Sequence, residues 1–334
     1  METPSFFWTF LILAGDRDTT CPVRVTEEGP TVKNRTAKAS VVVLALALAI
    51  ALSPSARAQS FQKVSVKGNA KMMQVASGGA SVWALATNGH PYIYKTNKFL
   101  QASAISLTQI AVGGGNLRQP DTVWGLDSSG NIYNATKSGT SWVFNQAPGV
   151  LSFIAVGIGY QDSCHLYEVW GLNPSAGIYR FNYCIGNWEN IPGTLQTLAV
   201  GGGEVWGVNG YGEVYNYDFE SRAFIKRDLP FPLAGPVAVG PDGAWVVYGT
   251  GDLVELIGND GYLFTGDPVN TYAVINAGGD GVWGLDSAGE IFLLRHSIRW
   301  AVQIPGSLAT ISVGSGAGVW GINPIGQVFA FSTQ

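Results

Sequence analysis

Short apolar runs broken by glycine-rich turns follow one another in a fixed order along residues 61–334. In the clearest copy, residues 110–112 are small or β-branched and end in glycine, and residues 123–126 read Val-Trp-Gly-Leu. A period of two places Trp124 and Leu126 on one face of a strand. The pattern therefore predicts short β-strands rather than helices.

The rest of this copy predicts two more strands and the turn before them. Asp127 and Gly130 bound a hairpin turn, because aspartate bonds its own following backbone and glycine accepts a positive φ. Ile132 opens the third strand, and residues 142–144 form the outer one before a Pro-Gly crossover. Each copy therefore predicts a four-stranded antiparallel unit.

The phrase occurs seven times. Its marker tryptophan recurs at intervals of 36 to 46 residues, at Trp83, Trp124, Trp170, Trp206, Trp245, Trp283 and Trp320. A period of this length with four strands per repeat is typical of propeller blades. We predict an all-β fold, a seven-bladed β-propeller of four-stranded antiparallel blades, with a six-bladed ring as the alternative. Neighbouring blades should cover the marker tryptophans, which we interpret as core residues.

The last repeat stops after three strands, at residues 329–331. Residues 61–68 place an aromatic residue and a glycine seven apart, as residues 142–149 do in the outer strand of the second repeat. We therefore expect the N-terminal segment to supply the missing strand and close the ring, which removes exposed sheet edges.

The segment before the repeats has the features of a secretory signal. Residues 32–58 combine basic positions, a twelve-residue apolar run at 41–52 and an Ala-Arg-Ala site, which predicts cleavage before Gln59. A twelve-residue helix spans about 18 Å, too short for a stable membrane anchor. Residues 1–31 lack a coherent pattern, and we interpret them as a mis-assigned start or an unstructured extension. Residues 59–334 are the propeller.

Charge and cysteine content narrow the class of protein further. Residues 59–334 hold 13 Lys and Arg against 18 Asp and Glu, with no basic run, which disfavours nucleic acid as a partner. Cys164 and Cys184 lie in two loops of the third repeat that share one side of the sheet. In a secreted chain we predict a disulfide between them; two free buried thiols are the alternative.

These phrases resemble the tectonin family of β-propeller lectins, which includes fungal tectonins, tachylectin-type proteins and fish egg lectins. The resemblance is carried by Ala-Val-Gly-Gly-Gly at 111–115 and 199–203, Val-Trp-Gly-Leu-Asp at 123–127 and 282–286, and the Trp-to-Ile-Pro-Gly segments at 188–193 and 300–306. A Gly-x-Ile-Tyr phrase stands at 130–133 and is shortened at 177–179. The resemblance implies recognition of cell-surface or microbial glycans, no catalysis, and ligand sites at blade junctions.

Two sets of residues are candidates for ligand contact. Outer-strand tryptophans could stack on sugar rings, with packing at the blade edge as the alternative: Trp142, Trp188 and Trp300. Turn residues could hydrogen-bond sugar hydroxyls, although their role in the turn already explains their identity: Asp127, Asn173, Asn209, Asp286 and Asn323.

Catalytic and metal chemistry find little support. His90, His165 and His296 occupy unlike positions in their repeats, so they form no repeated metal set. The Asp-x-x-Gly turns are shorter than a twelve-residue EF-hand loop. We expect no metal site and no cofactor, and keep calcium at a turn as an alternative.

We therefore expect a non-catalytic, multivalent lectin that is secreted to the periplasm or the cell exterior. A propeller that binds protein as an adhesin or scaffold is one alternative. A secreted propeller lyase or glycosidase is the other, and it predicts carboxylates, histidine or a metal near the axis.

Overall fold

The computed structural model describes residues 59–115, 119–158, 164, 165, 167–229, 234–249, 251–257, 261–264, 271–295 and 300–333. The predicted signal peptide and the segment before it lie outside these residues. No helix in the described ranges is long and apolar enough to cross a membrane.

The described strands fall into four positions within repeated units. The innermost strands are β2 (Met72–Ser77), β6 (Gln109–Gly113), β10 (Phe153–Gly157), β14 (Thr197–Gly201), β18 (Ala234–Gly240), β22 (Tyr272–Gly278) and β26 (Thr310–Val313). The second strands are β3 (Val82–Ala86), β7 (Thr122–Leu126), β11 (Glu168–Leu172), β15 (Glu204–Val208), β19 (Gly243–Tyr248), β23 (Gly281–Asp286) and β27 (Val319–Ile322).

The third strands are β4 (Pro91–Lys95), β8 (Asn131–Ser138), β12 (Gly177–Asn182), β16 (Val214–Asp218), β20 (Leu253–Ile257), β24 (Glu290–Arg295) and β28 (Val328–Thr333). The outer strands are β5 (Lys98–Gln101), β9 (Ser141–Val150), β13 (Asn187–Thr194), β17 (Ala223–Lys226), β21 (Gly261–Phe264), β25 (Trp300–Ser307) and β1 (Gln59–Val66). One short 3₁₀ turn, η1 (Lys67–Asn69), follows β1.

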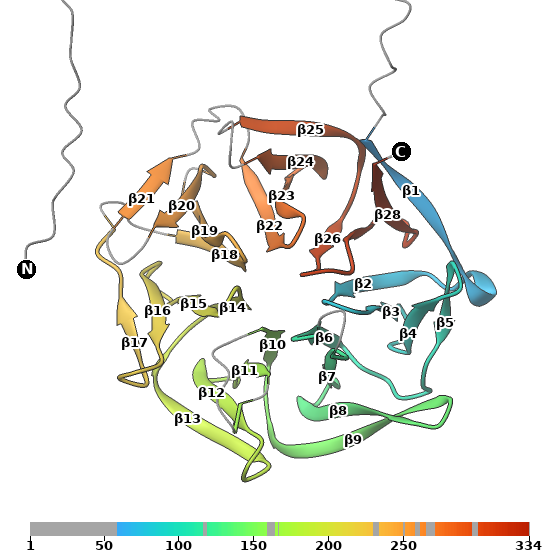
Figure 1. Cartoon of the computed structure of the whole chain (residues 1–334), viewed down its shortest axis with the longest axis horizontal. Helices are drawn as coiled ribbons and strands as arrows, with labels where there is room; N and C mark the ends of the chain where they lie inside the picture. The colour runs from blue at the N-terminus through green and yellow to red at the C-terminus, as the bar shows by residue number, and fades with distance from the viewer. Residues whose placement is uncertain are drawn as a thin grey trace, which may run out of the picture. The chain divides into compact units, whose positions relative to one another are not determined.

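These strands form seven four-stranded units among the described residues, numbered here as blades 1 to 7 from the blade that contains β2. Five are separate sheets, and blades 7 and 1 join into one eight-stranded sheet with the order β2-β3-β4-β5-β1-β28-β27-β26. Figure 1 shows the blades around a common centre, each with its first strand innermost. The prediction of an all-β propeller of four-stranded antiparallel sheets is confirmed.

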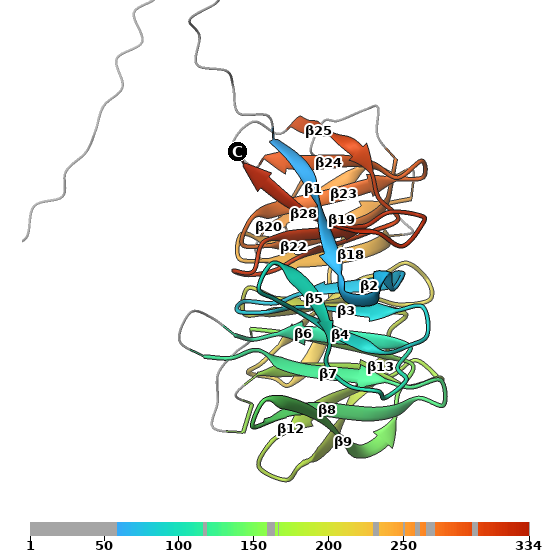
Figure 2. The ribbon, with the colours of Figure 1, turned by 90° about the vertical axis from the view of Figure 1, so that its right-hand side faces the viewer.

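The N-terminal strand closes the ring. β1 pairs antiparallel with β28, from Gln59 opposite Thr333 to Val64 opposite Val328, and then pairs in parallel with β5. Figure 2 shows β1 running between these two strands. After β1, the N–H of Met72 donates to the carbonyl of Gly326 at 2.9 Å. The same bond joins Leu151 to Gly130 and Leu308 to Gly289. Residues 59–72 therefore form the outer strand of blade 7 and the crossover from blade 7 to blade 1, as the equivalent segments do in other blades.

The glycine at the end of each inner strand, or directly after it in β2 and β26, permits contact between blade backbones near the axis. A Cβ atom added to Gly113 would lie 2.7 Å from the carbonyl oxygen of Val156 in the next blade. The equivalent atom on Gly157 would meet the carbonyl of Val200 at 2.5 Å. The recurring Ala-Val-Gly is thus a packing requirement of the ring.

The glycine after the marker tryptophan has a different neighbour. In six blades a buried residue lies just before, or at the start of, the inner strand, and we call it the crossover residue: Met72, Leu107, Leu151, Leu195, Tyr272 and Leu308. A Cβ atom on Gly125 would lie 2.6 Å from Cδ1 of Leu107, and the same clash joins Gly171 to Leu151. Glycine after the marker tryptophan therefore leaves space for the crossover leucine to pack against the second strand.

Candidate functional site at the blade junctions

The marker tryptophans form the floor of the junctions between blades. All seven are buried, with between 0% and 6% of their surface exposed. Six donate their indole N–H within the described part of the chain, for example Trp124 to the Thr122 hydroxyl at 3.0 Å and Trp170 to the Glu168 carboxylate at 2.7 Å. The interpretation of these residues as core is confirmed, so a ligand cannot stack on them.

Aromatic side chains of the following blade cover this floor. Trp142 of blade 2 packs edge-to-face on Trp83 of blade 1, with ring centroids 4.8 Å apart. Trp188 of blade 3 packs on Trp124 of blade 2 at 5.8 Å. At the next junction Phe224 packs on Trp170 at 5.7 Å. Two of the predicted ligand-contacting tryptophans, Trp142 and Trp188, thus fill junctions between blades.

Trp142 and Trp188 remain partly exposed, but their indole N–H groups are buried and have no hydrogen-bond partner. Only part of each ring can therefore meet a ligand, and the indole N–H cannot without rearrangement. Trp300 opens β25, and its side chain lies outside the described residues.

The turn residue of blade 2 is held by four hydrogen bonds. The Asp127 carboxylate accepts the N–H groups of Ser129 and Asn131 at 2.8 and 2.9 Å. It also accepts the Asn131 amide at 2.8 Å and the Tyr133 hydroxyl at 3.2 Å. Partial burial acts to raise the pKa of Asp127, but the hydrogen bonds, led by that from Asn131, hold the pKa below its usual value.

The other four predicted turn residues have the same geometry. Their side-chain oxygens accept main-chain N–H groups within the turn, from Ser175 and Gly177 to Asn173, from Tyr211 and Glu213 to Asn209, from Ala288 and Glu290 to Asp286, and from Gln327 to Asn323. The turn role of these residues is therefore real, and any ligand contact would use the remaining oxygen or amide.

The turn that begins at Asn173 in blade 3 differs from the sequence prediction. Ala176, with φ of 63°, occupies the left-handed position that Gly130 holds in blade 2 with φ of 79°. Gly177 corresponds to Asn131 instead, and a Cβ atom there would lie 3.2 Å from the Asn173 side chain. The Gly-x-Ile-Tyr phrase is thus full length in blade 3, with alanine in place of its glycine.

Three tyrosines join the turns to the junctions, and sequence reasoning did not assign them. The hydroxyl of Tyr133 donates to Asp127, and that of Tyr215 donates to Glu213 at 3.0 Å. The hydroxyl of Tyr179 lies 3.5 Å from the Asn173 amide. Burial and the adjacent carboxylate raise the pKa of both Tyr133 and Tyr215, so both hydroxyls stay protonated. The recurring Tyr of Gly-x-Ile-Tyr was the available signal.

Each tyrosine packs in the same junction as the outer-strand aromatic residue of its blade. Tyr133 lies with Trp142 in the cluster between blades 1 and 2, and Tyr179 lies with Trp188 in the next cluster. The strand register puts Asn131 opposite Val150 and Lys137 opposite Trp142, so turn and tryptophan start about 20 Å apart along the blade. The tyrosine therefore bridges two candidate sets that are distant in backbone position.

The turn of blade 4 carries additional charge. Lys226 donates to the Glu213 carboxylate at 2.6 Å, and the Asn209 amide donates to it at 2.7 Å. These bonds, led by that from Lys226, lower the pKa of Glu213 to about 2. Tyr211, at the tip of this turn, is 82% exposed. This turn offers a ligand both charge and an exposed aromatic ring.

The predicted disulfide is present between Cys164 and Cys184, with the Cα atoms 4.9 Å apart. Next to it, Glu168 and Arg180 form a buried ion pair with Nε to Oε2 at 2.9 Å. The Arg180 guanidinium also lies 5.2 Å from the ring of Phe219 in blade 4. Arg180 therefore links the ion pair of blade 3 to the next blade.

In the described ranges, no group of three or more His, Cys, Asp or Glu side chains is placed to hold a metal ion. The axial cavities are lined by aliphatic, amide and hydroxyl side chains, by Phe153 and by glycine backbone.

Comparison with protein families matches the Tectonin domain to residues 53–230 and 227–334. The chain belongs to the tectonin family. It is 37% identical to Tectonin-1 of Physarum polycephalum over 71 residues, which cover 21% of this chain and 29% of that protein. The matched segment is thus under a third of the length of Tectonin-1.

Solved structures resemble this tectonin in fold. "YCF48 bound to D1 peptide" superposes with a TM-score of 0.61 and 13% identity, over 82% of this chain and 97% of that chain. Human WBSCR16 gives a TM-score of 0.57 and 11% identity, over 80% of this chain and 87% of that one. At these identities the likeness shows the fold alone.

Proposed function

We propose that this tectonin is a secreted, non-catalytic protein that binds carbohydrate on cell surfaces or microbial envelopes at several blade junctions. The observation that carries the proposal is a combination repeated at three successive junctions: a partly exposed tyrosine beside the turn of its blade and an aromatic side chain from the outer strand. Repeated equivalent sites are what a multivalent lectin requires.

The chemistry of the junctions suits sugars. An aromatic ring presents an apolar face, and a tyrosine adds a polar hydroxyl at its edge. The hydroxyl of Tyr133 and the amide of Asn131 could exchange hydrogen bonds with the hydroxyls of one sugar unit. The ring edge of Trp142 could meet C–H groups of another unit of the same oligosaccharide, since the two places are about 20 Å apart along the blade. We expect weak affinity at each single site, which simultaneous binding of several sites would raise by orders of magnitude.

Secretion is supported by the signal-like segment at residues 32–58 and by the disulfide, which persists in oxidising compartments. The rival reading as a lyase or glycosidase requires two carboxyl groups about 5–10 Å apart at the reacting bond. The axial cavity, where such enzymes would place them, has no carboxylate or histidine among its described lining residues. This lining favours the non-catalytic proposal.

A glycan array and an agglutination assay with residues 59–334 test the proposal. We expect binding to at least one glycan class, lost at least tenfold in a triple variant with Tyr133→Phe, Tyr179→Phe and Tyr215→Phe. The control is Ser221→Ala, which removes an exposed hydroxyl that donates to Asp218 at 2.6 Å in the outer hairpin of blade 4. A folded protein that binds no glycan and no microbial envelope would remove the proposal.

A propeller that recognises protein is the second candidate. The observation in its favour is that YCF48, which shares the fold, is described as bound to a peptide. Capture of the same partner from enzymatically deglycosylated material and from untreated material would favour this candidate. Capture only from untreated material would favour the lectin.

A further inference from the structure

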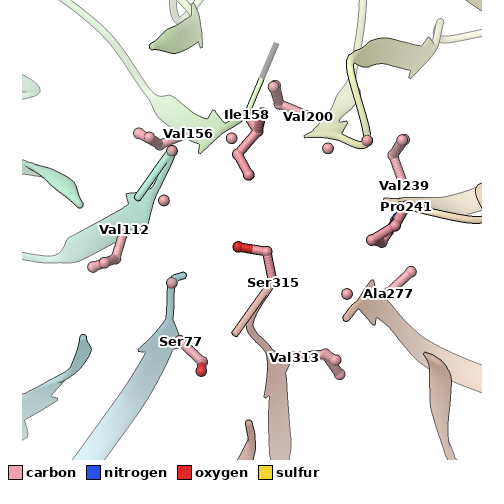
Figure 3. A pocket seen from close by; sticks show the side chains of 18 residues that line it. Ser77, Val112, Val156, Ile158, Val200, Val239, Pro241, Ala277, Val313 and Ser315 are labelled. Atoms are coloured by element: carbon pink, nitrogen blue, oxygen red, sulfur yellow. The ribbon is translucent and has the colours of Figure 1, made fainter. Parts of the chain in front are cut away.

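The inner strands enclose a channel along the axis of the ring. Two cavities, of about 460 and 240 Å³, share one lining residue from every blade: Ser77, Val112, Val156, Val200, Val239, Ala277 and Val313. They are consecutive parts of one passage. Figure 3 shows the smaller cavity, where the Ser315 hydroxyl and the Ile158 side chain point into the opening.

No described residue that lines the channel carries a charge. Burial of an ion without a partner costs several kcal/mol or more, so the channel selects against charged occupants. Its volume falls within the roughly 300–1,000 Å³ typical of small-molecule sites. The channel therefore suits a small neutral molecule.

Hydrogen bonds between inner strands close part of the channel wall. The amide of Gln74 in blade 1 accepts the N–H of Ile110 and donates to its carbonyl, both at 2.9 Å. Gln109 in blade 2 makes the same pair of bonds to Ile154, both at 3.1 Å. At these two junctions a side chain satisfies the backbone groups that face away from the blade.

In the ranges that the structure describes, the channel wall between blades 3 and 4 lacks this pair of side-chain hydrogen bonds. Phe153 replaces the glutamine in β10, and Leu198 of β14 corresponds to Ile154. Within the described residues no side chain bonds the N–H or the carbonyl of Leu198 in this way. Unpaired backbone groups of this kind require water or a ligand as partner. Phe153 lines the larger cavity and packs in the cluster that contains Leu198.

We propose that the channel binds one neutral, polyhydroxylated ring of monosaccharide size per chain, against the wall formed by Phe153 and Leu198. Hydroxyl groups both donate and accept, as the N–H and carbonyl of Leu198 require, and the C–H face of the ring suits the phenyl group. This site is separate from the blade junctions and does not depend on the proposed function.

Saturation-transfer NMR and isothermal titration calorimetry on residues 59–334 test the proposal. The probes are the methyl α-glycopyranosides of glucose, galactose and mannose, together with myo-inositol. We expect saturation transfer to at least one probe, and a stoichiometry of one per chain. A variant with Phe153→Gln should bind at least tenfold more weakly, because its amide would take the Leu198 groups as Gln109 takes those of Ile154.

Glutamine already occupies this repeat position in blades 1 and 2, so Phe153→Gln should keep its thermal midpoint. If it does not fold, Ser315→Trp in the smaller cavity should slow probe association at least fivefold, because the Ser315 side chain points into the opening. The control for the first variant is Val143→Gln, on the exposed part of β9, and the control for the second is Thr140→Trp in an outer hairpin.

If no probe shows saturation transfer, the proposal is wrong. It is also wrong if folded Phe153→Gln binds the probe as tightly as wild type. A stoichiometry of three or more per chain would assign the probes to the junctions and also overturn it. Agglutination should survive Phe153→Gln. One-to-one binding of a probe without agglutination would sink the lectin proposal and leave the channel site standing.

Discussion

At the scale of single residues, the position after the marker tryptophan shows how one contact fixes a residue type. In the chain order it reads Ala84, Gly125, Gly171, Gly207, Val246, Gly284 and Gly321. Where it is glycine, the crossover side chain occupies the place of a Cβ atom, as Leu151 does over Gly171. In blade 1, where it is Ala84, the crossover residue is Met72, which packs in the same cluster. A flexible thioether chain tolerates the extra methyl group.

We therefore expect Gly171→Ala to destabilise the protein by about 1–3 kcal/mol, because it overpacks a fully buried contact. Adding Leu151→Met, which reproduces the Met72 and Ala84 pair, should recover most of this loss. Urea unfolding curves measure both changes. An unchanged midpoint for Gly171→Ala would show that the crossover contact is looser than the structure indicates.

Glu213 provides a pH test at the same scale. Its pKa is about 2 in the folded protein against 4.5 for the unperturbed group, chiefly through the Lys226 bond. A lowered folded pKa contributes stability that is present above pH 4.5 and is lost as the pH falls from 4.5 to 2. Wild type should therefore melt at a higher temperature than Glu213→Gln above pH 4.5, and this difference in melting temperature should shrink as the pH falls from 4.5 to 2.

The control for this titration is Glu290→Gln, at the equivalent turn position of blade 6. A gap for Glu213→Gln that stays constant between pH 5 and pH 2 would contradict the assignment.

At the scale of strands and turns, the sequence was informative wherever neighbours along the chain decide the structure. The period of two and the Asx turns predicted the blades, because each depends on bonds within one repeat. The missing outer strand predicted ring closure for a different reason: the last repeat has only three strands, and β1 fills the gap by pairing with β28 at the other end of the propeller. The packing of Trp142 on Trp83 was not predictable in the same way, because that partner belongs to another blade. Ala176 was missed because alanine gives no signal of a left-handed turn.

The disulfide joins two loops of blade 3 that strands β11 and β12 separate. Closing a loop of about 20 residues stabilises a protein by about 3 kcal/mol. We expect a double variant with Cys164→Ser and Cys184→Ser to lose stability of this order in urea unfolding. Hydrogen exchange should become faster in blade 3 first. The control is wild type under a reducing agent, which should match the variant; equal stability of all three forms would refute the role.

At the scale of the whole molecule, side-chain hydrogen bonds link inner strands across the closure. Asn276 accepts the N–H of Val313 at 2.9 Å, and Ser312 accepts the N–H of Ser77 at 2.9 Å. With the Gln74 and Gln109 bonds they connect blades 6, 7, 1, 2 and 3 in one arc. The seam between the chain ends lies within this arc, so the ring is reinforced where it is covalently open.

The strand that seals this seam gives the test of closure. Deletion of residues 59–70 leaves β28 without its antiparallel partner and β5 without its parallel one. Losing several kcal/mol from a chain of this size lowers the melting temperature by on the order of 10 °C. Since every blade depends on both neighbours, the loss should appear as one cooperative transition in calorimetry, not as a separate early step.

A repositioned strand supplies the control. Gln59 lies opposite Thr333, so residues 59–70 can be attached after Gln334 through a two-residue hairpin turn. The outer strand follows the third strand along the chain in the same way in blades 1 to 6. This permuted chain should regain most of the lost melting temperature, although it lacks the covalent link from β1 to β2. If deletion alone leaves the transition unchanged, the inner-strand arc holds the ring by itself and β1 is only an edge cover.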